Sequence, residues 1–149
     1  MLVLFIVLRQ FSNRVGETVM SSIRNLLSKV FTAYMAGLIS GLVIEIIWIL
    51  VTTHSLNLNE DLKLELYRMM IWGGVWALLL VSPFPKNIWI RSAAMALIVI
   101  LFNYMIRMPY SGDGFFASNA GNDVFYANLI FNCPWALLAG FIYKLASNK

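Results

Sequence analysis

The chain is poor in charge and in metal-binding side chains. Only 12% of its 149 residues are charged, whereas soluble domains approach about a quarter. With a single cysteine and a single histidine, an intramolecular disulfide is excluded and a metal or haem held by Cys and His is not expected. No HExxH, Ser/His/Asp set, glycine-rich phosphate loop or paired aspartate motif occurs. We therefore expect no cofactor and no metal, and we favour a protein that is not an enzyme.

What the chain has is apolar sequence. Hydrophobic residues make up 60% of it, and its mean hydropathy is +0.77. About 20 apolar residues in a helix cross a bilayer, and four stretches approach that length, at about 31–51, 67–82, 88–106 and 124–143. The second is the shortest. We expect an all-α integral membrane protein in which residues 31–149 form one four-transmembrane-helix bundle.

The first 30 residues have a different pattern. From residue 11 to residue 30, apolar side chains recur at helical spacing among basic neighbours, which predicts a basic amphipathic helix on the cytoplasmic membrane surface. The run MLVLFIVL is too short to span, and Arg9 follows it directly. Two alternatives stay open, namely whether residues 1–8 enter the membrane and whether translation begins at Met1 or at Met20.

Basic residues divide unevenly between the two ends of the predicted spans. Lysine and arginine are enriched in cytoplasmic loops. The end of the spans with more of these residues is also the end where both termini lie, which predicts cytoplasmic termini in a multi-pass protein of the cell membrane (the inner membrane of a bacterium). The same division accounts for a pI near 9.4 without a nucleic-acid partner. The cytoplasmic set is Arg9, Arg14, Arg24, Lys29, Lys86, Arg91, Lys144 and Lys149, against Lys63, Arg68 and Arg107 outside.

Glu45 is the most informative residue, since it is the one charge within 31–51. It lies six residues from the nearer end of that span, or roughly 9 Å along a helix. A charge at that depth costs several kcal/mol, so it normally faces protein, water or a partner. Further polar residues fall in the same outer half of the membrane. The candidates for a ligand or proton site are therefore Glu45, Asn103, Arg107, Asn128, Asn132 and Arg68.

Small residues at four-residue spacing form a second pattern, which lets helix backbones approach closely. In the first span this ridge leads directly to Glu45. The predicted packing residues are Gly37, Gly41, Gly73, Gly74, Ala136 and Gly140. A structural alternative stays open, in which Glu45 and the asparagines only bridge helices and the arginines extend to headgroups.

The connecting segments carry their own signals. Asn59, Glu60 and Asp61 can begin a helix that leads into the second span. Prolines after Ser82 predict a tight turn and an antiparallel hairpin of the second and third spans. The segment 109–123 is rich in Gly, Ser and Asn, which predicts an irregular loop. Its Phe115 and Phe116 would dip onto the membrane or fold over the helices.

Two functions fit this sequence. The first is a membrane protein whose outward-facing polar pocket around Glu45 binds or transports a small cation, a proton or a polar solute. The second is an accessory or assembly subunit of a larger membrane complex or homo-oligomer, which docks through its small-residue helix faces. Four spans with an acid in the first resemble the small multidrug resistance transporters in span order. This chain is longer and has a large polar loop before the last span, so the likeness implies no function here.

Overall fold

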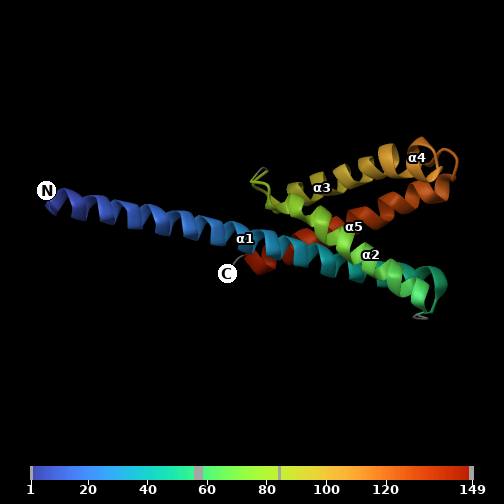
Figure 1. Ribbon diagram of the computed structural model, residues 1–149. Helices are drawn as coiled ribbons and strands as arrows, with labels where there is room; N and C mark the ends of the chain where they lie inside the picture. Colours follow the sequence, from blue (N-terminus) through green and yellow to red (C-terminus); the bar gives the residue numbers. More distant parts are fainter. Residues whose placement is uncertain (1, 56–58, 84, 148–149) are drawn as a thin grey trace.

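The computed structural model describes residues 2–55, 59–83 and 85–147, with side chains from residue 16 onward, and within these ranges it contains helices and no strand. Four long helices carry the fold (Figure 1): α1 (Leu2–Thr53), α2 (Glu60–Ala77), α3 (Ile88–Phe102) and α5 (Asn122–Ser147). Short elements extend or connect them, namely η1 (Leu78–Val81), η2 (Asn103–Arg107), α4 (Met108–Ser111) and η3 (Phe115–Ala117). The predicted all-α class is confirmed.

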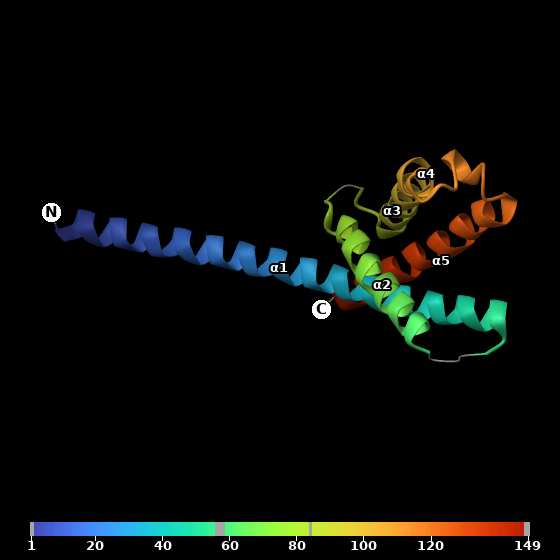
Figure 2. The same ribbon diagram turned by 45° about the vertical axis from the view of Figure 1, so that its right-hand side comes forward.

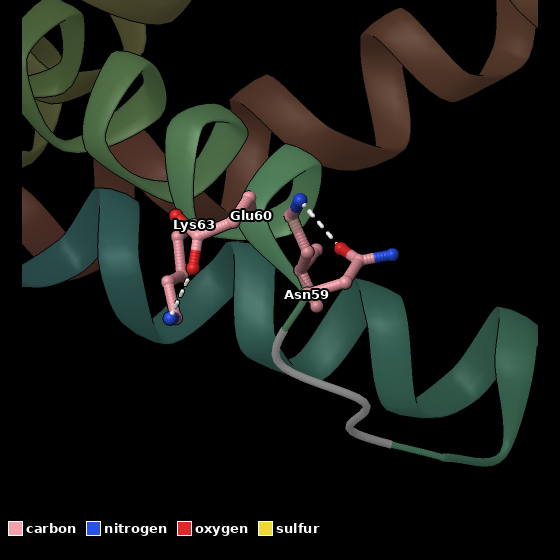
Figure 3. Close-up of polar contacts among 4 residues, drawn as sticks. Asn59, Glu60 and Lys63 are labelled. Atoms are coloured by element: carbon pink, nitrogen blue, oxygen red, sulfur yellow. Dashed lines mark hydrogen bonds and ion pairs between the residues drawn. The ribbon is translucent and has the colours of Figure 1, made fainter.

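Four stretches are long and apolar enough to cross a bilayer, namely Gly16–Thr53, Glu60–Val81, Ile88–Ser111 and Asn122–Ser147. The first, third and fourth predicted spans each fall inside one of these stretches, whereas the second, predicted at 67–82, ends one residue beyond Val81. The second begins at Glu60 rather than at 67, because Asn59 caps it. The Asn59 Oδ1 accepts the Leu62 N–H at 2.8 Å, and Lys63 Nζ lies 2.7 Å from Glu60 Oε1 (Figure 3). A capping asparagine followed by acidic residues stabilises a helix start.

The helix α1 runs for 52 residues and passes without a break from the N-terminal segment into the first span (Figures 1 and 2). Between Gly16 and Gly37 the sequence has neither glycine nor proline, so nothing in this region ends the helix. Residues 16–30 are all exposed. The N-terminal segment is therefore a continuation of the first span rather than a separate helix. Its predicted place on the membrane surface stays a prediction.

The long helices are arranged as two antiparallel pairs, α1 with α2 and α3 with α5. α1 also crosses α5, and this crossing joins the pairs. α2 and α3 diverge from the turn that connects them, as both views show (Figures 1 and 2). One contact between them joins Trp76 and Phe102, whose ring centroids lie 5.0 Å apart. The divergence leaves space between the pairs, where the candidate site lies.

Small residues allow the close approach of α1 and α2. A Cβ at Gly37 would overlap the main-chain oxygen of Gly73 and the Cβ of Ala77, so only glycine fits this contact. Trp135 of α5 reaches the same point, and its Nε1 donates to Gly37 O at 3.3 Å. The core around it is largely alanine, with Ala33, Ala36, Ala77, Ala136 and Ala139 all at most 1% exposed.

Arg91 fixes the turn between α2 and α3. Its guanidinium donates to Leu80 O at 2.6 Å and to Pro85 O at 3.0 and 3.1 Å. The last carbonyls of a helix have no partner within it, so this side chain satisfies the oxygen of Leu80 and ties it to the turn. The tight turn expected from the prolines is observed, but α2 and α3 diverge from it and pack mainly against other helices, α1 and α5 respectively.

The segment 109–123 is more ordered than its composition predicts. η2 and α4 continue from α3 as far as Ser111, where Gly112 ends the helix with a φ of 91°. Glycine has no Cβ and adopts this conformation readily. The centroid of the Phe116 ring lies 5.2 Å from that of the Tyr104 ring, so Phe116 packs against the helices. Phe115 is 59% exposed. Of the two phenylalanines, Phe116 folds over the helices.

Candidate functional site

A cavity of about 580 Å³ lies between the two helix pairs, on the side of the crossing where α1 ends and α2 begins. Its lining is mostly apolar, with polar groups from four elements. All six residues predicted as ligand or proton site candidates line it. They are Glu45 on α1, Arg68 on α2, Asn103 and Arg107 on η2, and Asn128 and Asn132 on α5. Their convergence in space is observed, and their role stays a prediction.

Glu45 is 5% exposed, and it lines the cavity. Among the described residues its carboxylate makes no direct hydrogen bond or ion pair, so the expected direct contact with an amide or an arginine is not observed. A contact through water stays a prediction. Every fully enclosed polar side-chain atom in the described part has a partner. The carboxylate oxygens are therefore open to the cavity and available to whatever fills it.

The arginines lie nearer the rim. Arg68 NH2 is 3.5 Å from Glu65 Oε1, with side-chain exposures of 57% and 47%, so this pair is open to solvent and weak. Arg107 is exposed at the other wall. Because Arg68 and Glu65 compensate each other, Glu45 is the acid in the lining without a paired cation.

The three asparagines form one buried network. Asn128 Oδ1 accepts from Asn103 Nδ2 and from Asn132 Nδ2, each at 2.8 Å. Asn132 Nδ2 also donates to Asn128 O at 2.7 Å, and Asn128 Nδ2 donates to Ile100 O at 3.4 Å. The network joins α5 to η2, so the amides hold helices together as well as lining the cavity. For these three residues the structural role is visible in their contacts.

The site lies beside an irregular turn of helix. At Asn103–Arg107 the chain forms a π-helix, η2, between α3 and α4. π-Turns occur frequently at functional sites, because they widen the helix and redirect side chains. Here both ends of the turn, Asn103 and Arg107, face the cavity.

Aromatic residues form much of the wall, and none of them was among the residues predicted for the site. Four of the five tryptophans line the cavity, which are Trp48, Trp72, Trp76 and Trp135. The spacing of these residues along the sequence could have indicated their place in the wall. Trp48 follows Glu45 by three residues, and on α2 Glu65, Arg68, Trp72 and Trp76 recur every three or four residues. Such spacing places side chains on one helix face.

The predicted packing residues lie in close helix contacts. A Cβ on Gly41 would lie 3.0 Å from Met69 O, and one on Gly74 would lie 2.7 Å from the Tyr34 ring. Gly73 faces Gly37, Gly140 faces the side chain of Ser92, and Ala136 is fully buried. These faces are covered by the chain itself.

In the part of the chain that the structure describes, no group of three or more His, Cys, Asp or Glu side chains is placed to hold a metal ion. Comparison of the chain with protein-family models, with curated proteins and with solved structures finds no match. The proposal below therefore depends on the residues of this chain alone.

Proposed function

We propose that this protein is a multi-pass protein of the cell membrane, with both termini cytoplasmic, that binds a cationic solute in the cavity around Glu45 and carries it across the bilayer. The main support for this proposal is the Glu45 carboxylate. Glu45 is 5% exposed, its carboxylate is open to the cavity, and it has no direct partner among the described residues. An unpartnered carboxylate in apolar surroundings is costly, and a bound cation would remove that cost.

The size and the lining of the cavity support an organic cation over a bare ion. About 580 Å³ lies within the range of sites for small organic ligands. Tryptophan faces attract cations, by about 0.5 to 2 kcal/mol per contact, and four tryptophans line the wall. Glu45 would supply the opposite charge and the aromatic rings the apolar contact.

A pair of probes of equal shape and opposite charge tests the proposal. Tetraphenylphosphonium is a cation and tetraphenylborate is its anionic counterpart, so a difference in their binding reports charge rather than size. We expect the purified protein in detergent to bind the cation in preference to the anion. Glu45→Gln keeps the side-chain shape and removes the charge. It should weaken cation binding by about tenfold or more, the loss expected for an interaction with a charged group.

Glu60→Gln is the matched control, because it removes one carboxylate near the same end of the helices from a residue that pairs with Lys63 and does not line the cavity. Its binding should equal that of the native protein. Transport is tested by uptake of the cation into liposomes with an imposed pH gradient. Unchanged binding and uptake in a folded Glu45→Gln variant would end the proposal.

An accessory subunit is the second candidate, and one observation favours it. The exposed part of α1 carries apolar side chains with no helix against them, including Val19, Ile23, Leu26 and Leu27, each at least 48% exposed. Docking through the small-residue faces is disfavoured, because those faces are already packed within the chain. Sizing in mild detergent, with identification of co-purifying proteins, tests this candidate. Loss of a co-purifying partner or of a homo-oligomer in Ile23→Gln/Leu26→Gln would support it.

A further inference from the structure

A second hollow lies at the opposite end of the helices, between the α2–α3 turn and the end of α5. Its volume is about 700 Å³. Among the described residues, its lining has three basic side chains and no acid. The residues that form it are Lys86, Asn87, Ile88, Trp89, Arg91, Tyr143, Lys144 and Ser147.

Among the described residues, neither lysine of this hollow forms an ion pair with an acid. The ion pairs among the described residues are Lys63–Glu60 and Arg68–Glu65, and both lie at the other end of α2. Lys144 Nζ is 5.8 Å from the centroid of the Trp89 ring, which holds the ammonium beside the opening by a cation–π contact. Lys86 is exposed at the turn.

Arg91 and the start of α3 add to the positive field. Arg91 donates to Leu80 O and Pro85 O, which fixes its position while its charge remains. α3 begins at Ile88, after the Asn87 cap, so the positive end of its dipole is at the hollow. Three cations and a helix N-terminus thus surround one open space.

The hollow lies where three of the candidate spans end, which is the level expected for lipid headgroups. The second candidate span ends at Val81, the third begins at Ile88 and the fourth ends at Ser147. All three ends meet here, and Trp89 is 42% exposed beside them, as interfacial tryptophans are. Basic pockets between membrane helices bind anionic headgroups.

We propose that Lys86, Lys144 and Arg91 form a binding site for a phosphate group, such as the phosphodiester of an anionic phospholipid. The two lysine ammonium groups contact the phosphate oxygens, and Arg91 supports them from its fixed place in the turn. This site is separate from the cavity around Glu45, and its test does not depend on the solute bound there.

The test uses the full chain in detergent micelles containing dioleoyl phosphatidylglycerol or dioleoyl phosphatidylcholine, with bound lipid counted by native mass spectrometry. We expect the anionic lipid to bind in preference. Each surface lysine contributes roughly fivefold to the binding of an anionic lipid, so Lys86→Gln/Lys144→Gln should lower the affinity by about tenfold or more. Arg91 is kept, because its loss would disturb the turn.

Arg24→Gln/Lys29→Gln is the matched control, because it removes two positive charges from α1 outside the hollow. Its loss of anionic-lipid binding should be smaller than that of Lys86→Gln/Lys144→Gln, because its two charges lie outside the hollow. An equal loss in this control, or unchanged binding in Lys86→Gln/Lys144→Gln, would overturn the proposal. If the double variant fails to fold, Lys86→Gln alone makes the same test with a loss of roughly fivefold.

A second arm separates the sources of the phosphate group. Inorganic phosphate is added in excess to the lipid-bound protein. Retention of the lipid supports a phospholipid as the ligand. Displacement of the lipid from the native protein supports the same site with a soluble phosphate compound as its ligand.

Discussion

Trp135 Nε1 donates a hydrogen bond of 3.3 Å to the main-chain oxygen of Gly37, although the two residues are 98 positions apart. Gly73 completes the contact, since a Cβ added there would lie 2.7 Å from Gly37 O and 3.2 Å from Trp135 Nε1. Helices α1, α2 and α5 therefore meet at one point. Both Gly73 and Trp135 also line the cavity, so this meeting point closes the end of the cavity opposite its rim.

Gly37→Leu should separate α1 from α2. The side chain would have to displace the backbone of Gly73 and the Cβ of Ala77, and overpacking of this kind costs about 1 to 3 kcal/mol or more. The melting temperature in detergent should fall. Gly16→Leu is the control, because nothing lies within 4 Å of a Cβ at Gly16. Equal melting temperatures for the two variants would contradict the packing described here.

Glu45→Leu should raise the melting temperature while it removes cation binding. The carboxylate has no direct partner among the described residues, so its replacement by an apolar side chain removes a desolvation cost. A functional residue commonly lowers stability in this way. Thermal melting and tetraphenylphosphonium binding are measured on the same sample. A clear drop in melting temperature would show that Glu45 holds the helices together, as the structural alternative requires.

Asn128→Leu should destabilise the protein by about 1 to 3 kcal/mol, because Asn103 Nδ2 loses its acceptor in a buried place. The double variant Asn103→Leu/Asn128→Leu removes both partners and should recover part of that loss. Melting of the native protein, both single variants and the double variant gives the coupling energy. Strictly additive losses would mean that the bond between these amides contributes nothing.

Arg91→Lys should weaken the turn between α2 and α3. Lysine keeps the charge but cannot reproduce the guanidinium fork that reaches both Leu80 O and Pro85 O. The expected loss is about 1 to 3 kcal/mol, measured by thermal melting. Lys86→Gln lies in the same turn on an exposed side chain and should melt like the native protein. If Arg91→Lys melted at the native temperature, the hydrogen bonds of the Arg91 guanidinium would not stabilise the turn.

The proposed topology places Ser118 outside the cell and Ser147 inside it. Cys133 is the one cysteine, so Cys133→Ser gives a background for single new cysteines at Ser118 and Ser147, both exposed. A membrane-impermeant maleimide should label the first in intact cells and the second only after lysis. Labelling of both from the same side would exclude the four-span arrangement.

Much of the fold follows from local sequence. Apolar runs near 20 residues predict the four long helices, and the Asn59 cap with its acidic neighbours predicts the start of α2. The glycines of the first and second spans predict a close helix contact, and Gly37 and Gly73 make one. These features depend on residues within one element or on the size of a side chain, which a sequence states directly.

The shape of the site depends on relations that no single segment contains. Apolar length does not fix the angle between helices, so the divergence of α2 from α3, which creates the cavity, could not be predicted. The π-turn at Asn103–Arg107 has no sequence signature of its own. The six polar candidates were found because charge and amides are rare in spans, whereas Trp48 and Trp72 were not, because tryptophan is common in membrane proteins.

The unbroken course of α1 makes it a lever. Its 52 residues correspond to about 78 Å of helix at 1.5 Å per residue. One arm carries Glu45 and packs against α2 and α5, and the other arm, of roughly 42 Å, extends beyond them. With the fulcrum at the Gly37 crossing, the N-terminal end of α1 lies about 53 Å away, so a tilt of about 10° would move it through roughly 9 Å. A rearrangement around a ligand at Glu45 would therefore be magnified at the N-terminal end, far from the cavity.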